Sequence, residues 1–184
     1  KDTFPLPSIE DNLVRLANSQ IYSAIDGSGA FHVSSIKKED RPKTSFSTPW
    51  GTYQFTKMPF GLCNGPASYS RLVQLVLHGI PGDAALPYLD DTIIHSSTLD
   101  QHVVNLGRVL EAHRKAGLRL QPSKCQLFRD KVEYLGHLVS EDGVGTVPDY
   151  IQLIKDWPIP TTKSEARTWL GKCGYYRRFV KGYS

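Results

Sequence analysis

Two adjacent aspartates, Asp90 and Asp91, lie between two apolar segments and limit how the middle of this chain can fold. Tyr88 and Leu89 precede the pair, and the β-branched run 92–94 follows it. Neighbouring side chains of a regular strand point to opposite faces, so both carboxylates reach one site only if the chain turns there. Carboxylates about 4 Å apart repel each other by roughly 1–4 kcal/mol at a surface-like dielectric. A divalent cation offsets this repulsion best, and Mg²⁺ prefers oxygen ligands.

A solvent-exposed polar turn is the simpler interpretation of an Asp-Asp pair, and it stays open at this point. The β-branched residues directly after the pair weigh against it, because a solvent turn does not need them. A third carboxylate, Asp26, ends an apolar strand predicted over 20–26 and precedes a glycine-containing break at 27–30. If this strand lies beside the one that leads to Asp90, three carboxylates converge where two metals bind. A turn residue before glycines is the alternative for Asp26.

Helical and extended patterns alternate irregularly along the rest of the chain. Apolar residues at helical spacing predict helices over 8–18, 66–78, 99–116 and 148–157. A capping box formed by Thr162 and Glu165 predicts the start of a last helix. Further strands are predicted over 43–47, 52–56, 87–96, 125–128 and 132–139, with turns at 49–51 and 141–143. Because this order lacks the βαβα rhythm of a doubly wound sheet, we predict an α+β fold with an antiparallel sheet packed on helices.

Composition excludes several classes of protein. The three cysteines, Cys63, Cys125 and Cys173, are far apart and form no Cys-x-x-Cys, which argues against a disulfide framework or a zinc knuckle. The net charge of +4 permits a polyanionic partner without requiring one. No long apolar run or targeting signal is present, so we predict no membrane partner. The chain begins at Lys1 without an initiator methionine, and we interpret it as a piece of a longer polypeptide.

Ten short blocks follow one another along the chain, at 5–11, 22–26, 29–32, 43–46, 54–62, 88–91, 117–118, 124–125, 134–137 and 175–179. They include YSAID at 22–26, QFTKMPFGL at 54–62, YLDD at 88–91 and YYRRF at 175–179. In this order the blocks resemble the reverse transcriptases of gypsy-type (Ty3-like) long-terminal-repeat retrotransposons. The resemblance implies a polymerase palm with partial fingers over 1–140. It also implies a palm-to-thumb connection and the first thumb helix over 141–184.

The resemblance implies that Asp26, Asp90 and Asp91 are the catalytic, metal-binding triad. The backbone carbonyl of Gly27 is implied as a further metal contact, although relatives usually carry a larger side chain at this position. The implied cofactor is Mg²⁺, with Mn²⁺ as the alternative. In such enzymes two metals activate the attacking primer hydroxyl and stabilise the leaving oxygen.

The same resemblance implies a nucleotide pocket. Phe31 matches the aromatic gate that packs beneath the incoming sugar and leaves no room for a 2′-hydroxyl. An ordinary core aromatic is the alternative for Phe31. Pro59, Phe60 and Gly61 resemble the loop that lines the pocket for the deoxynucleoside triphosphate.

Contacts with the primer and the duplex are implied as well. Tyr134, Leu135 and Gly136 resemble the hairpin that grips the primer end, and Tyr88 is implied as another primer contact. A plain strand with a turn would look the same. In the last segment, the basic residues Lys172, Arg177 and Arg178 match the part of the thumb that tracks the nucleic-acid backbone. An amphipathic helix with a solvated basic face is the alternative.

We therefore expect an RNA-directed DNA polymerase from a retrotransposon Pol polyprotein, working on an RNA or DNA template with a primer. Its covalent partners would be RNase H, integrase and protease, and its location cytoplasmic virus-like particles with a nuclear stage. Two alternatives are an inactive or co-opted remnant that binds nucleic acid or protein, and an RNA-copying RNA polymerase, which Phe31 disfavours. In the family, basic residues that hold the triphosphate would precede Lys1. The 184 residues alone are therefore expected to show little or no polymerase activity.

Overall fold

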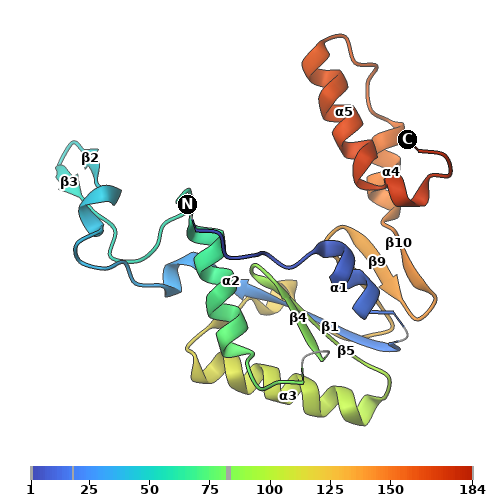
Figure 1. Cartoon of the computed structure of the whole chain (residues 1–184), viewed down its shortest axis with the longest axis horizontal. Helices are drawn as coiled ribbons and strands as arrows, with labels where there is room; N and C mark the ends of the chain where they lie inside the picture. Colours follow the sequence, from blue (N-terminus) through green and yellow to red (C-terminus); the bar gives the residue numbers. More distant parts are fainter. Residues whose placement is uncertain (1, 18, 82–83, 184) are drawn as a thin grey trace.

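The computed structural model describes residues 2–17, 19–81 and 84–183, and its centre is an antiparallel sheet (Figure 1). The strand order is β4-β5-β1-β6, and β7 also pairs with β1. These strands are β1 (Ile21–Ser28), β4 (Ala85–Tyr88), β5 (Asp91–Ser96), β6 (Arg119–Leu120) and β7 (Gln126–Arg129). Helices lie against this sheet, so the predicted α+β class with an antiparallel sheet is confirmed.

The predicted helices form close to their expected limits. They are α1 (Ile9–Arg15), α2 (Gly65–Val76), α3 (Leu99–Lys115), α4 (Pro148–Lys155) and α5 (Lys163–Tyr175). The side chain of Ser8 caps α1 by accepting a hydrogen bond from the Asp11 N–H at 3.4 Å. Thr162 and Glu165 form the predicted capping box of α5. None of the helices in the described ranges is long and apolar enough to cross a membrane.

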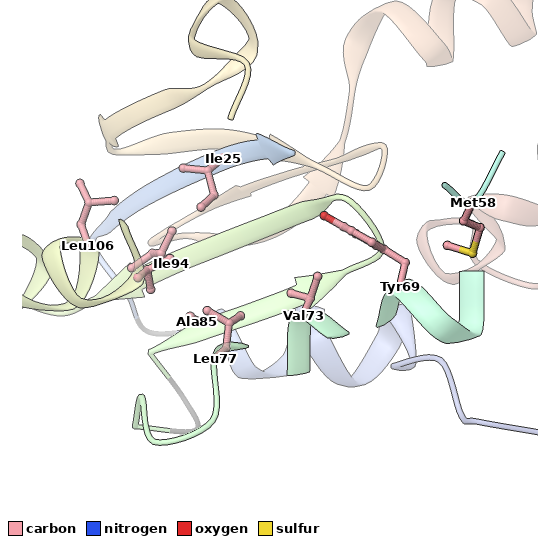
Figure 2. Packing of buried hydrophobic residues seen from close by; sticks show 9 residues of the cluster. Ile25, Met58, Tyr69, Val73, Leu77, Ala85, Ile94 and Leu106 are labelled. Atoms are coloured by element: carbon pink, nitrogen blue, oxygen red, sulfur yellow. The ribbon is translucent and has the colours of Figure 1, made fainter. Parts of the chain in front are cut away.

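Two hydrophobic cores lie on opposite faces of the central sheet. Successive residues of a strand face opposite sides, so Ile94 enters one core and its neighbour Ile93 enters the other. The first core, between the sheet and helices α2 and α3, contains Ile25, Met58, Tyr69, Val73, Leu77, Ala85, Ile94, Leu106 and Val109 (Figure 2). The second core contains Leu13, Leu16, Tyr22, Leu86, Ile93, Val132, Tyr134 and Val139. Helix α1 and a second sheet cover this second face.

The second sheet corrects the strand predicted over 132–139. That segment is a hairpin of β8 (Lys131–Tyr134) and β9 (His137–Ser140), and β10 (Gly143–Thr146) pairs with β9. Leu135 and Gly136 form the turn, with φ values of 47° and 68°. A two-residue hairpin turn of this kind requires positive φ at both positions, which a glycine adopts readily and a leucine only at a cost. The prediction of one strand was wrong because apolar residues lie on both sides of the turn, whereas the resemblance of residues 134–136 to a hairpin indicated the turn correctly.

A small hairpin of β2 (Phe46–Thr48) and β3 (Gly51–Tyr53) lies away from the central sheet (Figure 1). Its strands are shorter than predicted. Strand β2 begins later because 41–44 form a 3₁₀ helix that contains Pro42. At the other end of the chain, α4 and α5 follow β10 and lie outside the two main cores (Figure 1).

Candidate active site

The ends of β1 and β5 bring Asp26 and Asp91 to one edge of the sheet. These strands pair antiparallel, and the register sets Asp26 directly opposite Asp91. Strands β4 and β5 form a hairpin whose turn contains Leu89 and Asp90. The Gly27 N–H donates a hydrogen bond to the Asp90 carbonyl at 2.9 Å, which ties this turn to the end of β1. The predicted turn at the aspartate pair is confirmed, and the strands that carry the carboxylates lie side by side.

The β4–β5 turn is strained. Leu89 has a φ of 54°, and this left-handed conformation costs a non-glycine residue roughly 1–2 kcal/mol. Such strain persists only where the surroundings hold it, here through the β4–β5 pairing and the Gly27–Asp90 hydrogen bond. Because of this turn, the side chains of Asp90 and Asp91 have different environments. Asp91 shares a sheet face with Asp26, its cross-strand partner, whereas Asp90 is exposed in the turn.

The three carboxylates influence one another electrostatically. Burial, followed by the negative charges of Asp90 and Asp26, raises the pKa of Asp91 to about 6. Lys124 opposes this shift. The edge therefore concentrates negative charge that a cation would stabilise.

Lys124 is a site residue to which the sequence alone gave no role. Its Nζ lies 3.6 Å from the Asp26 Oδ2, at the end of the 3₁₀ helix Pro122–Lys124. The Gln121 N–H donates to the Asp26 carbonyl at 2.9 Å and places this 3₁₀ helix beside the acidic edge. The only sequence signal for Lys124 was its place in the block 124–125.

The four residues predicted to bind nucleotide line one cavity. The cavity has a volume of about 240 Å³ and is lined by Phe31, Pro59, Phe60, Gly61, Leu62, Cys63, Gly65 and Pro66. The Phe31 ring meets the Phe60 ring edge-on with 5.2 Å between centroids, and the Tyr69 ring with 5.8 Å. Phe31 also packs against the first core. Phe31 therefore both borders the cavity and packs against the core, and the gate role stays a prediction.

Of the residues predicted to hold the primer, Tyr134 is buried in the second core. Its hydroxyl donates to the Leu86 carbonyl at 3.3 Å and accepts from the Asn12 amide at 3.2 Å. Burial raises its pKa well above the usual value for tyrosine. The Tyr134 ring is thus a structural element beneath the β8–β9 turn, and the partly exposed Leu135 and Gly136 form the accessible part of the hairpin.

Two tyrosines at the end of α5 hold this turn. The Tyr175 hydroxyl donates to the Leu135 carbonyl and the Tyr176 hydroxyl to the Gly136 carbonyl, each at 2.6 Å. The Nδ1 atom of His137 lies 2.9 Å from the Leu135 carbonyl, and its ring packs against both tyrosines. We call Tyr175, Tyr176 and His137 the tyrosine latch. The pattern in the sequence did not reveal it, although both tyrosines lie in the block 175–179.

Residues 1–139 match the family described as "Reverse transcriptase (RNA-dependent DNA polymerase)". The chain belongs to the reverse transcriptase family. It is 37% identical over 183 residues to the "Retrovirus-related Pol polyprotein from transposon 297" of Drosophila melanogaster, covering 100% of this chain and 17% of the relative. It is 34% identical over 183 residues to the corresponding polyprotein from transposon gypsy of the same organism, covering 100% of this chain and 18% of the relative. The predicted resemblance to gypsy-type elements is therefore confirmed, and the chain spans less than a fifth of these relatives.

Solved reverse transcriptase structures share the fold. The foamy viral protease-reverse transcriptase in complex with RNA/DNA hybrid superposes with a TM-score of 0.87 at 26% identity, covering 96% of this chain and 24% of that one. A second foamy viral structure, in complex with ds DNA, gives a TM-score of 0.88 at 27% identity, covering 97% of this chain and 32% of that one. The architecture of the central sheet is thus that of a reverse transcriptase.

Membership in the reverse transcriptase family implies a divalent metal, and the acidic edge fits one in chemistry and charge. Within the described ranges, no group of three or more His, Cys, Asp or Glu side chains is close enough together to hold a metal ion. Mg²⁺ keeps several waters and needs only one or two carboxylates from a protein, so a complete cage is not required. Burial is the main cause of the raised pKa of Asp91, and the charges of Asp90 and Asp26 add to it while Lys124 opposes it.

The basic residues of the reverse transcriptase's last segment are exposed. Lys172 lies on α5, with its Nζ 4.6 Å from the centre of the Trp157 ring. Arg177 and Arg178 lie in the 3₁₀ helix that follows, next to the tyrosine latch. Their charges face solvent, as contact with a phosphate backbone would require.

Removing both hydroxyls of the tyrosine latch is expected to loosen the β8–β9 turn. In the Tyr175→Phe/Tyr176→Phe double variant two turn carbonyls lose their donors, and each such hydrogen bond contributes about 0.5–1.5 kcal/mol. Hydrogen–deuterium exchange of the full-length protein should show faster exchange at 134–138 and unchanged exchange in α3. The control is Tyr53→Phe, an exposed tyrosine of β3. Unaltered exchange at 134–138 would show that the turn holds itself without the latch.

Proposed function

We propose that this chain carries the polymerase centre of a retrotransposon reverse transcriptase, an RNA-directed DNA polymerase that extends a primer with deoxynucleotides. The observation that carries the proposal is the register that sets Asp26 opposite Asp91, with Asp90 in the adjoining turn. The foamy viral structures were solved with an RNA/DNA hybrid and with ds DNA. A primer on an RNA or DNA template is the corresponding substrate proposed for this chain.

We infer that Asp26, Asp90 and Asp91, with the carbonyl of Gly27, hold Mg²⁺, and that Mn²⁺ can replace it. The bound metal supplies charge stabilisation to the attacking and leaving oxygens of an in-line displacement at the α-phosphate. The chain's own part is to hold carboxylates at the end of two paired strands, so that they need no large rearrangement. Lys124, 3.6 Å from Asp26, contributes a fixed positive charge at the same edge.

The cavity bordered by Phe31, Pro59, Phe60 and Gly61 is the proposed site of the deoxynucleotide. The Phe31 ring is supported from behind by the Tyr69 ring and by the first core. A ring held in this way cannot move aside for a 2′-hydroxyl. Selection of a deoxyribose requires such a fixed ring. The exposed Phe60 is 68% accessible and gives the cavity a second apolar wall.

The primer and the duplex are proposed to lie along the β8–β9 turn and the last segment. Leu135 and Gly136, together with Tyr88 of the β4–β5 hairpin, would contact the primer end, with Tyr134 supporting them from the core. Lys172, Arg177 and Arg178 would contact phosphates of the duplex. Because the tyrosine latch joins these two regions, the position of the duplex and that of the primer end are coupled.

We also propose a setting for this activity. Residues 1–140 would form the palm with part of the fingers, and 141–184 the connection and first helix of the thumb. The relatives are Pol polyproteins, so RNase H, integrase and protease are the proposed covalent partners. Virus-like particles in the cytoplasm, with a nuclear stage, are the proposed location.

Primer extension by the full-length protein tests the proposed function. On a primed RNA template with deoxynucleoside triphosphates and Mg²⁺ we expect extension, its loss on chelation by EDTA, and its return when Mg²⁺ or Mn²⁺ is added in excess. Binding of the primed template without extension, where a known reverse transcriptase extends it, would support the inactive remnant instead. Preferential incorporation of ribonucleotides would indicate an RNA polymerase.

A further inference from the structure

Tyr69 brings a hydroxyl from the first core to the acidic edge. Its side chain projects from α2 and is only 3% exposed, and its oxygen points toward the β4–β5 hairpin (Figure 2). Burial raises its pKa to about 12, with further contributions from the charges of Asp90 and Asp26, so the hydroxyl is neutral and lies in the field of both carboxylates. A phenylalanine would bury the same ring without the cost of desolvating a hydroxyl. The hydroxyl therefore calls for a reason of its own.

Gly27 supplies that reason. A Cβ atom added to Gly27 would lie 3.1 Å from the Tyr69 hydroxyl oxygen and 3.1 Å from the Asp90 carbonyl oxygen. Both distances are shorter than ordinary van der Waals contact, which begins at about 3.4 Å. Gly27 is not one of the glycines with positive φ, so its backbone conformation suits any residue. A side chain at position 27 would thus be crowded, and the Tyr69 hydroxyl and the Asp90 carbonyl would have to give by a few tenths of an ångström to admit it.

Neither neighbour can withdraw easily. The Asp90 carbonyl accepts the Gly27 N–H at 2.9 Å, which is the hydrogen bond that ties the strained turn to β1. The Tyr69 ring packs edge-on against Phe31 and is enclosed by Val73, Ile25 and the rest of the first core. A side chain at position 27 would therefore press on both neighbours. Removing the Tyr69 hydroxyl would leave only the contact with the Asp90 carbonyl, which a shift of a few tenths of an ångström would relieve.

We propose that Gly27 and Tyr69 form a size-complementary pair, in which the Tyr69 hydroxyl takes the place of a side chain at position 27 and holds the Asp90 turn in register with Asp26. Tyr69 is in this sense a positioning residue, because it acts through the turn and not on the substrate. The consequence for catalysis rests on the proposed polymerase function, whereas the packing does not.

A double-mutant cycle in the full-length protein tests the pair. Gly27→Val is expected to lower the kcat for primer extension by about 10–100-fold, since small misplacements of catalytic groups have effects of this size. Tyr69→Phe alone should lower it only a few-fold. In the Gly27→Val/Tyr69→Phe double variant the methyl groups enter the space left by the hydroxyl, and kcat should return to within a few-fold of the original protein. Gly107→Ala, in α3 with open space around it, is the matched control and should change nothing.

Hydrogen–deuterium exchange at position 27 and at 88–91 gives a second measurement that does not depend on activity. Exchange should rise in Gly27→Val and fall back in the double variant, even if the original protein extends no primer. If the original protein extends no primer but the exchange follows this pattern, the proposed function is contradicted and the Gly27–Tyr69 pair is supported. The pair would be overturned if the two substitutions lowered kcat independently, so that their fold-changes multiplied in the double variant. It would also be overturned if Gly27→Val behaved like the original protein in both measurements. Recovery of exchange without recovery of kcat would overturn the positioning role.

Discussion

Replacing Asp26 or Asp90 by Asn in the full-length protein is expected to lower the rate of primer extension at least about 1,000-fold. Metal stabilisation of the transition state is worth several kcal/mol, and each 1.36 kcal/mol corresponds to a factor of ten in rate. Asn keeps the shape of the side chain but removes the negative charge that the metal needs. Both residues lie at the edge where strands β1 and β5 meet, so either change disturbs the same site.

Binding of the primed template should change little in these variants, because the proposed phosphate contacts come from basic residues elsewhere. The fold should also tolerate the change, since each variant removes one of three mutually repelling carboxylates. Extension rate and template affinity are therefore measured together, with Asp142→Asn as the control, an exposed aspartate between β9 and β10. Substantial extension by Asp26→Asn or Asp90→Asn would show that the carboxylates of this edge are not the metal-binding triad.

Replacing Phe31 by Val or Ala is expected to raise ribonucleotide incorporation relative to deoxynucleotide incorporation. A pocket that discriminates by the fit of one small group provides roughly 10–200-fold, and the ratio should rise within that range. The reason is the support of the ring: Phe60 and Tyr69 hold it edge-on, so only a smaller side chain opens room for a 2′-hydroxyl. The measurement is the ratio of kcat/KM for a ribonucleotide to that for the matching deoxynucleotide.

Phe46→Val serves as the control, because Phe46 is an exposed phenylalanine of β2 outside the cavity. Both phenylalanine variants lose an aromatic ring, but only the change at Phe31 alters the cavity wall. If Phe31→Val and Phe31→Ala left the ratio unchanged, Phe31 would be a core residue and the sugar would be selected elsewhere.

Local patterns in the sequence determined much of this protein. Helical spacing and the capping residues Ser8 and Thr162 predicted helices that the structure confirms. The apolar flanks of Asp90-Asp91 predicted a turn between strands, and the ordered blocks predicted the family. These features depend on residues a few positions apart, whose preferences are expressed within one helix or one turn. The β8–β9 turn at Leu135-Gly136 is the exception, since the local pattern predicted one strand there and only the resemblance to a hairpin indicated the turn.

Tertiary structure alone decided how the parts of the site meet. The register of β1 against β5 sets Asp26 opposite Asp91, and a slip of one strand by one residue would turn its aspartate to the opposite face of the sheet. Only packing across 42 positions of sequence, from Gly27 to Tyr69, crowds the space next to Gly27 at the acidic edge. The tyrosine latch joins residues 40 positions apart, as Tyr175 to Leu135 and Tyr176 to Gly136. Sequence patterns give the hydrophobic periodicity within each helix or strand. These contacts instead depend on how far apart the elements lie once the two cores have packed on the faces of the sheet.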